Sequence, residues 1–242
     1  MALKVMTYNI QHGLDYKKLL NKERIIDLDK IYQVIKDENI DLVGLNEVYN
    51  DVNNIETVEQ VKYLANKLGF NYYFFGQSIT LKNVIGYGNA IISKYPLTNY
   101  KIYKIDDPII KDEDTYYESR IIIECDLLIN NESIKVFVTH LGLAKSEKIN
   151  GTKKLLEVIK DKEKIILLGD FNMEEDNNNI ILLSNELFNT SKLIEGCKCT
   201  YTSVNPKEKI DYIFVKGIDV ISSKVVKKIA SDHYPVVCEI KL

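Results

Sequence analysis

An apolar run in the second half of the chain ends in polar side chains. The stretch KIILLGDFNM, residues 164–173, has the pattern of a buried strand, but it closes with Gly169, Asp170 and Asn172. Strand interiors disfavour these residue types, so the strand is expected to end there. Side chains two positions apart lie on the same side of an extended chain. Asp170 and Asn172 are therefore predicted to reach the same edge of a sheet.

The same pattern recurs along the chain, where an acid, an amide or an imidazole lies at the end of a short apolar strand. The further residues placed in this way are Asn9, Glu47, His140, Asp211, Asp232 and His233. Burying such a group is costly unless it is paired or bound to a metal. Taken singly, each has an ordinary structural explanation, such as a turn, a surface charge or a hydrogen-bonded core histidine. Taken together, their complementary types favour one functional site.

The residue types in this set indicate two kinds of chemistry. Carboxylates and amides suit a hard cation such as Mg²⁺, whereas histidines suit proton transfer or contact with phosphate. An acid beside a histidine can orient its ring. Two of the three histidines in the chain, His140 and His233, belong to the set. We interpret the third, His12, as a surface residue, with substrate contact as the less favoured alternative.

The elements that must position these residues are mixed along the whole chain. Apolar runs predict strands at residues 3–8, 41–48, 71–75, 89–93, 119–128, 133–140, 164–170, 209–215, 219–226 and 235–241. The runs 119–128 and 133–140 flank the turn residues 130–132 and predict a β-hairpin. Helical periodicity predicts helices at 29–38, from a Thr57 cap to Gly69, at 153–161 and at 178–186. No Gly/Ser-rich linker divides residues 1–242, so a single α/β domain is expected. Many strands with few intervening helices favour two packed sheets with helices outside.

Composition limits the possible functions. The 242 residues are 45% hydrophobic and 28% charged, which is ordinary for a globular domain. A net charge of -3 and a pI of about 5.8 give no support to non-specific nucleic-acid binding, although a local basic patch stays possible. The sequence shows neither a signal peptide nor a membrane span. A cytoplasmic monomer is therefore expected.

The four cysteines fall into two groups. Cys125 and Cys238 lie within apolar strand patterns and are predicted to be buried thiols. Cys197 and Cys199 form a C-x-C pair, which is either half of a zinc site or two loop cysteines. No second Cys or His pair lies near them in the sequence, so the loop interpretation is favoured.

The motifs in order resemble those of a known family. They are TYNIQHG, LVGLNEV, GNAIISKYPL, ESR, VFVTHLG, LLGDFN, IDYIFV and SDHYPV, and they lie within residues 5–237. Each is short, but their order resembles the endonuclease/exonuclease/phosphatase superfamily, the metal-dependent phosphohydrolases related to deoxyribonuclease I. The resemblance implies a four-layer α/β/β/α sandwich with its site at one rim of the two sheets.

The resemblance also implies roles for the residues named above. Glu47 matches the family's metal-binding glutamate, Asn9 lies beside the metal, and Asp232 matches a carboxylate close to it. The implied metal is Mg²⁺ or Mn²⁺.

The remaining matches concern the reaction itself. Asp170 matches the aspartate that positions or deprotonates the attacking water, and Asn172 matches the asparagine that fixes this aspartate and the phosphate. His140 matches a phosphate-facing position. His233 matches the essential histidine, and Asp211 the acid that hydrogen-bonds it. The implied activity is hydrolysis of a phosphoester by a phosphodiesterase, nuclease or phosphatase.

Several sequence features that distinguish individual subfamilies, and with them the substrate, are missing from this chain. Gln11 stands where many nucleases place an acid, and the chain has no Trp. Arg120 either supports phosphate or ties Glu118, and the structural role is favoured. Tyr116 and Tyr117 either line the site or lie at the surface, and the surface is favoured. The substrate therefore stays open among nucleic acid, a phospholipid headgroup and a small phosphate ester, and the acidic pI favours the last.

Two other classes of function are weighed against the enzyme. A catalytically silent binding module on the same fold is expected to have lost Glu47, Asp170 or His233, but all three are present. A protein-interaction domain is expected to show an apolar surface stripe, and none is visible in the sequence. The enzyme is therefore favoured.

Overall fold

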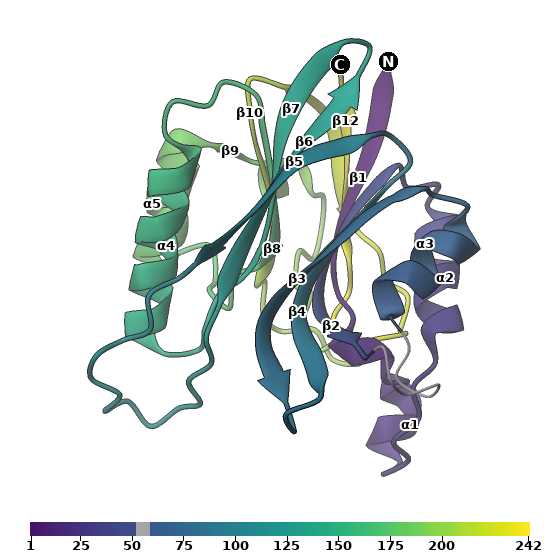
Figure 1. Ribbon diagram of the computed structural model, residues 1–242, viewed down its shortest axis with the longest axis vertical. Coiled ribbons are helices and arrows are strands. Elements are labelled where there is room, and N and C mark those ends of the chain that lie inside the picture. The colour runs from purple at the N-terminus through teal and green to yellow at the C-terminus, as the bar shows by residue number, and fades with distance from the viewer. Residues whose placement is uncertain (52–58) are drawn as a thin grey trace.

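Two six-stranded mixed sheets pack face to face, with helices on both outer faces (Figure 1). The computed structural model describes residues 1–51 and 59–242. The predicted cap at Thr57 lies outside the described residues. The layer order is the four-layer α/β/β/α sandwich expected from the family resemblance.

The first sheet has the strand order β11-β12-β1-β2-β4-β3 and the second β5-β6-β7-β8-β10-β9. The first consists of β11 Asp219–Val225, β12 Val236–Lys241, β1 Ala2–Asn9, β2 Leu42–Asn50, β4 Ile85–Ser93 and β3 Tyr72–Leu81. The second consists of β5 Leu97–Lys104, β6 Ile121–Ile129, β7 Glu132–His140, β8 Ile165–Asp170, β10 Asp211–Lys216 and β9 Phe188–Asn189. The pairs β1–β2 and β7–β8 are parallel, and the other pairs are antiparallel.

Three apolar layers hold the sandwich together. Successive side chains of a strand point to opposite faces, so Val5 of β1 lies in the core between the sheets while Met6 packs under the helices of the first sheet. These are α2 Leu28–Asp37 and α3 Gln60–Leu68, whereas α4 Lys145–Ile159 and α5 Asn178–Glu186 cover the second sheet (Figure 1). A short helix, α1 Tyr16–Leu20, follows a 3₁₀ turn at Gln11–Gly13, and another 3₁₀ turn spans Thr190–Leu193.

Most of the predicted elements are present. Helix α5 has the predicted bounds, α3 ends at Gly69 in the left-handed conformation, and β6 and β7 form the predicted hairpin. Helix α4 begins at Lys145 rather than at Lys153. Its first turns carry few apolar residues, so periodicity did not reveal them, but Glu147 accepts a hydrogen bond from the backbone N–H of Ala144 and caps the helix.

Three further elements, α1, β5 and the two-residue strand β9, were not predicted. Strand β5 lies at an edge of its sheet and exposes most of its side chains, so it lacks the apolar run that marks a buried strand. Cys125 and Cys238 are buried as predicted, Cys197 is exposed and Cys199 is half-buried, and all four are free thiols. No helix in the described part of the chain is long and apolar enough to cross a membrane.

The two sheets approach closely at Gly44 of β2. A Cβ atom built on Gly44 would lie 2.9 Å from Cδ1 of Leu168 in β8 and 3.0 Å from Cγ2 of Val138 in β7. Such distances are shorter than ordinary van der Waals contacts, so the absence of a side chain allows the sheets to pack here.

Gly44→Ala is expected to lower the free energy of unfolding by about 1–3 kcal/mol, because the added methyl group overpacks the core. Combined with Leu168→Ala, it is expected to cost less than the sum of the two single changes, since the shorter side chain makes room for the methyl group. Denaturant unfolding measures both, with exposed Val84→Ala as the control. Full additivity would show that the two side chains do not compete for this space.

Candidate active site

Three of the candidate residues lie in one row across the second sheet. His140 is paired in register with Asp170 across the parallel strands β7 and β8, and Asp170 is paired with Asp211 across the antiparallel strands β8 and β10. Directly paired residues project to the same face of a sheet. The register therefore brings an imidazole and two carboxylates together at the ends of adjacent strands.

The facing end of the first sheet supplies Asn9 and Glu47. Asn9 ends β1 and is paired with Asn46 of β2. The pairing of β2 with β4 shifts between Leu45 and Val48, and Glu47 has a positive φ of 57°. Bulges of this kind redirect side chains next to functional sites. Here the bulge places Asn46 between the sheets and Glu47 on the wall of a cleft.

Asp232 and His233 come from the loop before β12. The hydroxyl of Ser231 donates to the backbone carbonyl of Asn9 (2.8 Å), and the hydroxyl of Ser203 donates to the carbonyl of Ser231 (2.6 Å). These buried bonds fix the loop against the end of β1, so His233 is held between the two sheets.

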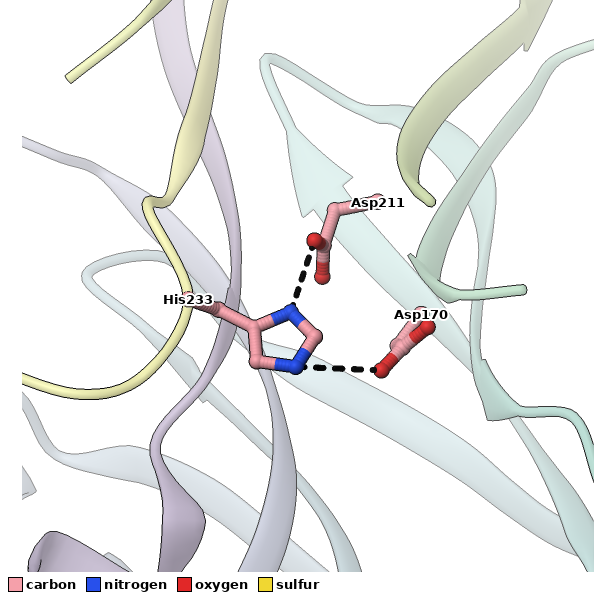
Figure 2. Close-up of side chains that lie close together, drawn as sticks. All are labelled: Asp170, Asp211 and His233. Carbon is pink, nitrogen blue, oxygen red and sulfur yellow. Dashed lines mark hydrogen bonds and ion pairs between the residues drawn. The ribbon is translucent and has the colours of Figure 1, made fainter. Parts of the chain in front are cut away.

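His233 lies between two carboxylates (Figure 2). Its Nδ1 is 2.9 Å from Oδ2 of Asp211, and its Nε2 is 3.7 Å from Oδ2 of Asp170. The predicted hydrogen bond between Asp211 and His233 is therefore present. Burial alone lowers the pKa of a histidine, but the charges of Asp211, Asp170 and Asp232 outweigh it and raise the pKa of His233 well above its usual value.

Asp170 is the most connected carboxylate of the site. Its Oδ2 accepts from Asn9 Nδ2 (3.0 Å), its Oδ1 accepts from the backbone N–H of Asn172 (2.9 Å), and its own N–H donates to Oδ1 of Asn46 (3.0 Å). Burial and the nearby Asp211 raise the pKa of Asp170 to about 7, although His233 and these N–H donors oppose the shift. A carboxylate with this pKa can both hold and accept a proton near neutral pH.

His140 is held by a cation instead of a carboxylate. Arg120 NH1 lies 3.0 Å from Nδ1 of His140 and 2.8 Å from Oε1 of Glu118. Burial, with Arg120 and His233 nearby, lowers the pKa of His140 well below its usual value. A guanidinium has only N–H donors, so Nδ1 must accept and the neutral ring carries its proton on Nε2.

The Nε2–H of His140 meets a second donor. Nδ2 of Asn172 lies 3.2 Å from this nitrogen and also donates to the backbone carbonyl of Leu141 (2.8 Å). Turning the amide would place its oxygen against that carbonyl, so the nitrogen stays where it is. Two N–H groups therefore converge beside Asp170, which is the arrangement of a site for an oxygen acceptor.

The acids could hold a divalent cation in two ways. The first set is Asp170, Asp211 and His233, whose ligand atoms lie within 4.8 Å of one another. In this set the protonated ring of His233 already supplies the positive charge beside both carboxylates. The second set is Glu47 and Asp232, whose hydrogen-bond partners are neutral: Glu47 accepts from Asn9 Nδ2 (3.0 Å), and Asp232 Oδ1 lies 3.0 Å from the hydroxyl of Ser231.

The pKa of Asp232 bears on the choice between these two sets of acids. Burial raises it to about 6, and Glu47 adds to the shift against the opposing charge of His233. Two acids that repel each other at a rim fit a hard cation. The oxygen of Asn9 faces elsewhere, since Oδ1 accepts from the backbone N–H of Gln11 (3.1 Å). Its assignment as a metal ligand stays a prediction.

Most of the candidate residues line one cleft of about 360 Å³. Its walls are formed by Glu47, Tyr87, Tyr116, Glu118, Arg120, His140, Leu143, Asp170, Asn172, Tyr201, Glu208, Ile210, Asp232 and His233. Asn9 and Asp211 lie behind this wall and contact it through the bonds described above.

The residues whose roles were left open fall in different places. Tyr116 is exposed on the cleft wall, while the hydroxyl of Tyr117 accepts from the backbone N–H of Glu113 away from it. Arg120 ties Glu118, as favoured from the sequence, and also contacts His140. His12 is half-buried and stacked on Tyr49, with ring centroids 4.2 Å apart, so the prediction of a surface residue is not met.

Sequence reasoning missed Asn46, which joins the sheets. Its Nδ2 donates to the carbonyl of Thr139 in β7 (2.8 Å) and to Oδ1 of Asn89 in β4 (2.9 Å), while its Oδ1 accepts from the N–H of Asp170. The signal was an amide inside the apolar run LVGLNEV, next to a glutamate that drew the interpretation instead. The bond from Ser231 to the carbonyl of Asn9 and the contact of Arg120 with His140 were missed as well, since no local sequence pattern reveals either contact.

Comparisons with known proteins identify the family of the chain. The sequence pattern of the endonuclease/exonuclease/phosphatase family matches residues 6–233. The chain therefore belongs to the endonuclease/exonuclease/phosphatase family. No curated protein sequence matches it significantly.

Several solved structures have the same fold. An endonuclease/exonuclease/phosphatase from Beutenbergia cavernae is 22% identical, with a TM-score of 0.82 over 100% of this chain and 72% of that one. A mannosyl-6-phosphatase of Bacteroides thetaiotaomicron is 16% identical, with a TM-score of 0.78 over 99% and 100%. A D. rerio TDP2 complexed with a single-stranded DNA product is 15% identical, with a TM-score of 0.71 over 100% and 99%. At these identities the likeness concerns the fold alone.

Asn46→Leu is expected to lower the free energy of unfolding by about 2–6 kcal/mol. The similar-sized apolar side chain leaves the N–H of Asp170 and the carbonyl of Thr139 buried without their partner, at about 1–3 kcal/mol for each. Denaturant unfolding measures the loss, and Asn66→Leu on the exposed side of α3 is the control. Equal stability of the two variants would contradict the role of Asn46 in joining the two sheets.

Proposed function

We propose that the chain, acting as a single domain, is a divalent-metal-dependent hydrolase of phosphoesters. The observation that carries the proposal is the convergence of the His140 and Asn172 N–H donors beside a buried carboxylate and a charged histidine. Phosphoryl oxygens are acceptors that would satisfy these donors, and an imidazolium opposite them would stabilise developing negative charge. The family membership supports the same reaction class.

Each of these residues would have a separate role in an in-line displacement at phosphorus. Asp170, held by Asn9 and Asn172, orients the attacking water and accepts its proton as the new bond to phosphorus forms. His233 remains protonated because Asp211 lies against Nδ1, and its Nε2 faces the reacting centre. Neutral His140 donates to a phosphoryl oxygen through Nε2, and Arg120 keeps the ring in that tautomer.

Glu47 and Asp232 are the residues proposed to hold Mg²⁺ or Mn²⁺, with Asn9 beside them. When bound there, the cation neutralises phosphate charge and stabilises the leaving oxygen. Asn9 donates to both Glu47 and Asp170, and so sets the distance between the metal-holding acid and the acid that orients water.

Removal of divalent metal is expected to abolish hydrolysis of a general substrate such as bis(4-nitrophenyl) phosphate or 4-nitrophenyl phosphate. Added Mg²⁺ or Mn²⁺ should restore it. Glu47→Gln keeps the size of the side chain but removes its charge, so we expect kcat/KM to fall about a hundredfold and Mg²⁺ affinity to weaken. Titration calorimetry and turnover measure the two effects, with exposed Glu186→Gln as the control. Full activity of metal-stripped protein in excess EDTA would contradict the proposal.

His233→Ala is expected to lower kcat by about 10²- to 10³-fold without unfolding the protein, because it removes a charge that stabilises the transition state. Asp211→Asn should also cost rate, since the amide can reverse the polarity of the hydrogen bond. The double variant should lose much less than the product of the two effects, because each change disables the same pair. A double-mutant cycle on kcat/KM measures this coupling, and full multiplication would show that the two residues act independently.

A further inference from the structure

The cleft around the proposed phosphate position has acidic and aromatic walls. Five carboxylates line it, namely Glu47, Glu118, Asp170, Glu208 and Asp232. Tyr116, Tyr201 and Leu143 also line it, and Tyr116 and Leu143 are 63% and 45% exposed. The volume of about 360 Å³ lies at the small end of the range for small-molecule sites, which is about 300–1,000 Å³.

The cleft has no spare cation for a second anionic group. Arg120 is the one arginine or lysine among the described residues that line it. Its guanidinium is ion-paired with Glu118 and contacts His140, and the side chain is only 10% exposed. A polynucleotide is bound through cations that follow its phosphates. The cleft therefore suits a substrate whose part beyond the reacting phosphate carries no charge.

Glu208 lines the cleft, and its backbone is fixed although its side chain is exposed. Its backbone carbonyl accepts from the N–H groups of Thr200 (2.8 Å) and Tyr201 (3.1 Å), and its own N–H donates to the carbonyl of Tyr201 (2.9 Å). The ring of Tyr201 in turn lies against His233, with centroids 4.9 Å apart. This hairpin places the Tyr201 ring beside the histidine and Glu208 on the wall of the same cleft.

We propose that the substrate is the monophosphate ester of a sugar or another small polyol, and that Glu208 determines this specificity by accepting hydrogen bonds from its hydroxyl groups. The inference rests on the proposed function and names its substrate class. An ionised carboxylate only accepts hydrogen bonds, so it favours hydroxyl donors and repels a second phosphate. In the reaction, water supplies the oxygen that bonds to phosphorus, the ester P–O bond breaks, and the alcohol leaves with a proton from that water.

The substrate class is tested with five compounds under metal-replete conditions, by phosphate release from the hexose phosphates, nitrophenol release from the nitrophenyl esters and strand cleavage of the DNA. They are a hexose 6-phosphate, a hexose 1,6-bisphosphate, 4-nitrophenyl phosphate, bis(4-nitrophenyl) phosphate and a short single-stranded DNA. We expect kcat/KM for the hexose 6-phosphate to exceed that for the bisphosphate at least tenfold, and DNA to be the poorest substrate. Preference for the bisphosphate or for DNA would overturn the inference.

The role of Glu208 is tested by reversing its charge. Glu208→Lys is expected to raise the ratio of kcat/KM for the bisphosphate to that for the monophosphate about tenfold, because it replaces a repelling charge by an attracting one. Glu195→Lys makes the same change of charge at an exposed residue outside the cleft and should leave the ratio unchanged. Thermal unfolding of both variants checks that they remain folded. An equal ratio in both variants would remove Glu208 from specificity.

The outcomes separate the two proposals. Hydrolysis of either nitrophenyl ester without a preference for the hexose monophosphate overturns the substrate class and leaves the proposed function standing. Hydrolysis of none of the five compounds overturns the proposed function together with the inference. Selective hydrolysis of the hexose monophosphate, with the predicted change in Glu208→Lys, supports both.

Discussion

The buried carboxylate of Asp170 is the constraint on which the rest of the site depends. The strand register places it directly beside Asp211, and two buried acids in neighbouring positions repel each other. His233 resolves this conflict, because its charged ring lies between them (Figure 2). The same oxygen of Asp170, Oδ2, lies 3.6 Å from Nε2 of His140, which faces Arg120 and stays neutral. One carboxylate thus contacts two histidines with opposite charge states, and such divergence is how one site can combine different roles in proton transfer and charge stabilisation.

The sandwich positions this carboxylate from both sheets at once. Asp170 belongs to the second sheet, whereas Asn9 and Asn46, which bind its side chain and its backbone N–H, belong to the first. The apolar core between the sheets sets their separation, and Gly44, two residues before Asn46, allows the close approach. A small change in sheet packing would therefore move Asn46 and Asn9 relative to Asp170. The packing of the two sheets therefore determines the geometry of the site.

The sequence allowed the sandwich and the convergence of the strand-end residues to be predicted, because apolar runs interrupted by acids and amides are local patterns. Helix α5 and the hairpin of β6 and β7 were likewise visible from periodicity and turn residues. The hydrogen bonds by which Asn46 joins the two sheets could not be predicted, since an amide inside a strand does not reveal which sheet it will bond. The bulge that turns Glu47 into the cleft depends on pairing with β4, and the tautomer of His140 depends on Arg120, 20 positions earlier. Such features arise from tertiary pairing and have no signature in a single segment.

The charge states of the two histidines test the central claim most directly. The chain has three histidines, so the imidazole nitrogens of protein labelled with ¹⁵N-histidine give a simple NMR spectrum that substitution of His12 helps to assign. At neutral pH in metal-free protein, the account predicts that His233 carries protons on both nitrogens, because Asp211 and Asp170 raise its pKa. His140 should be neutral, with its proton on Nε2. Two rings that titrate together near pH 6.5, or a neutral His140 with its proton on Nδ1, would contradict the account.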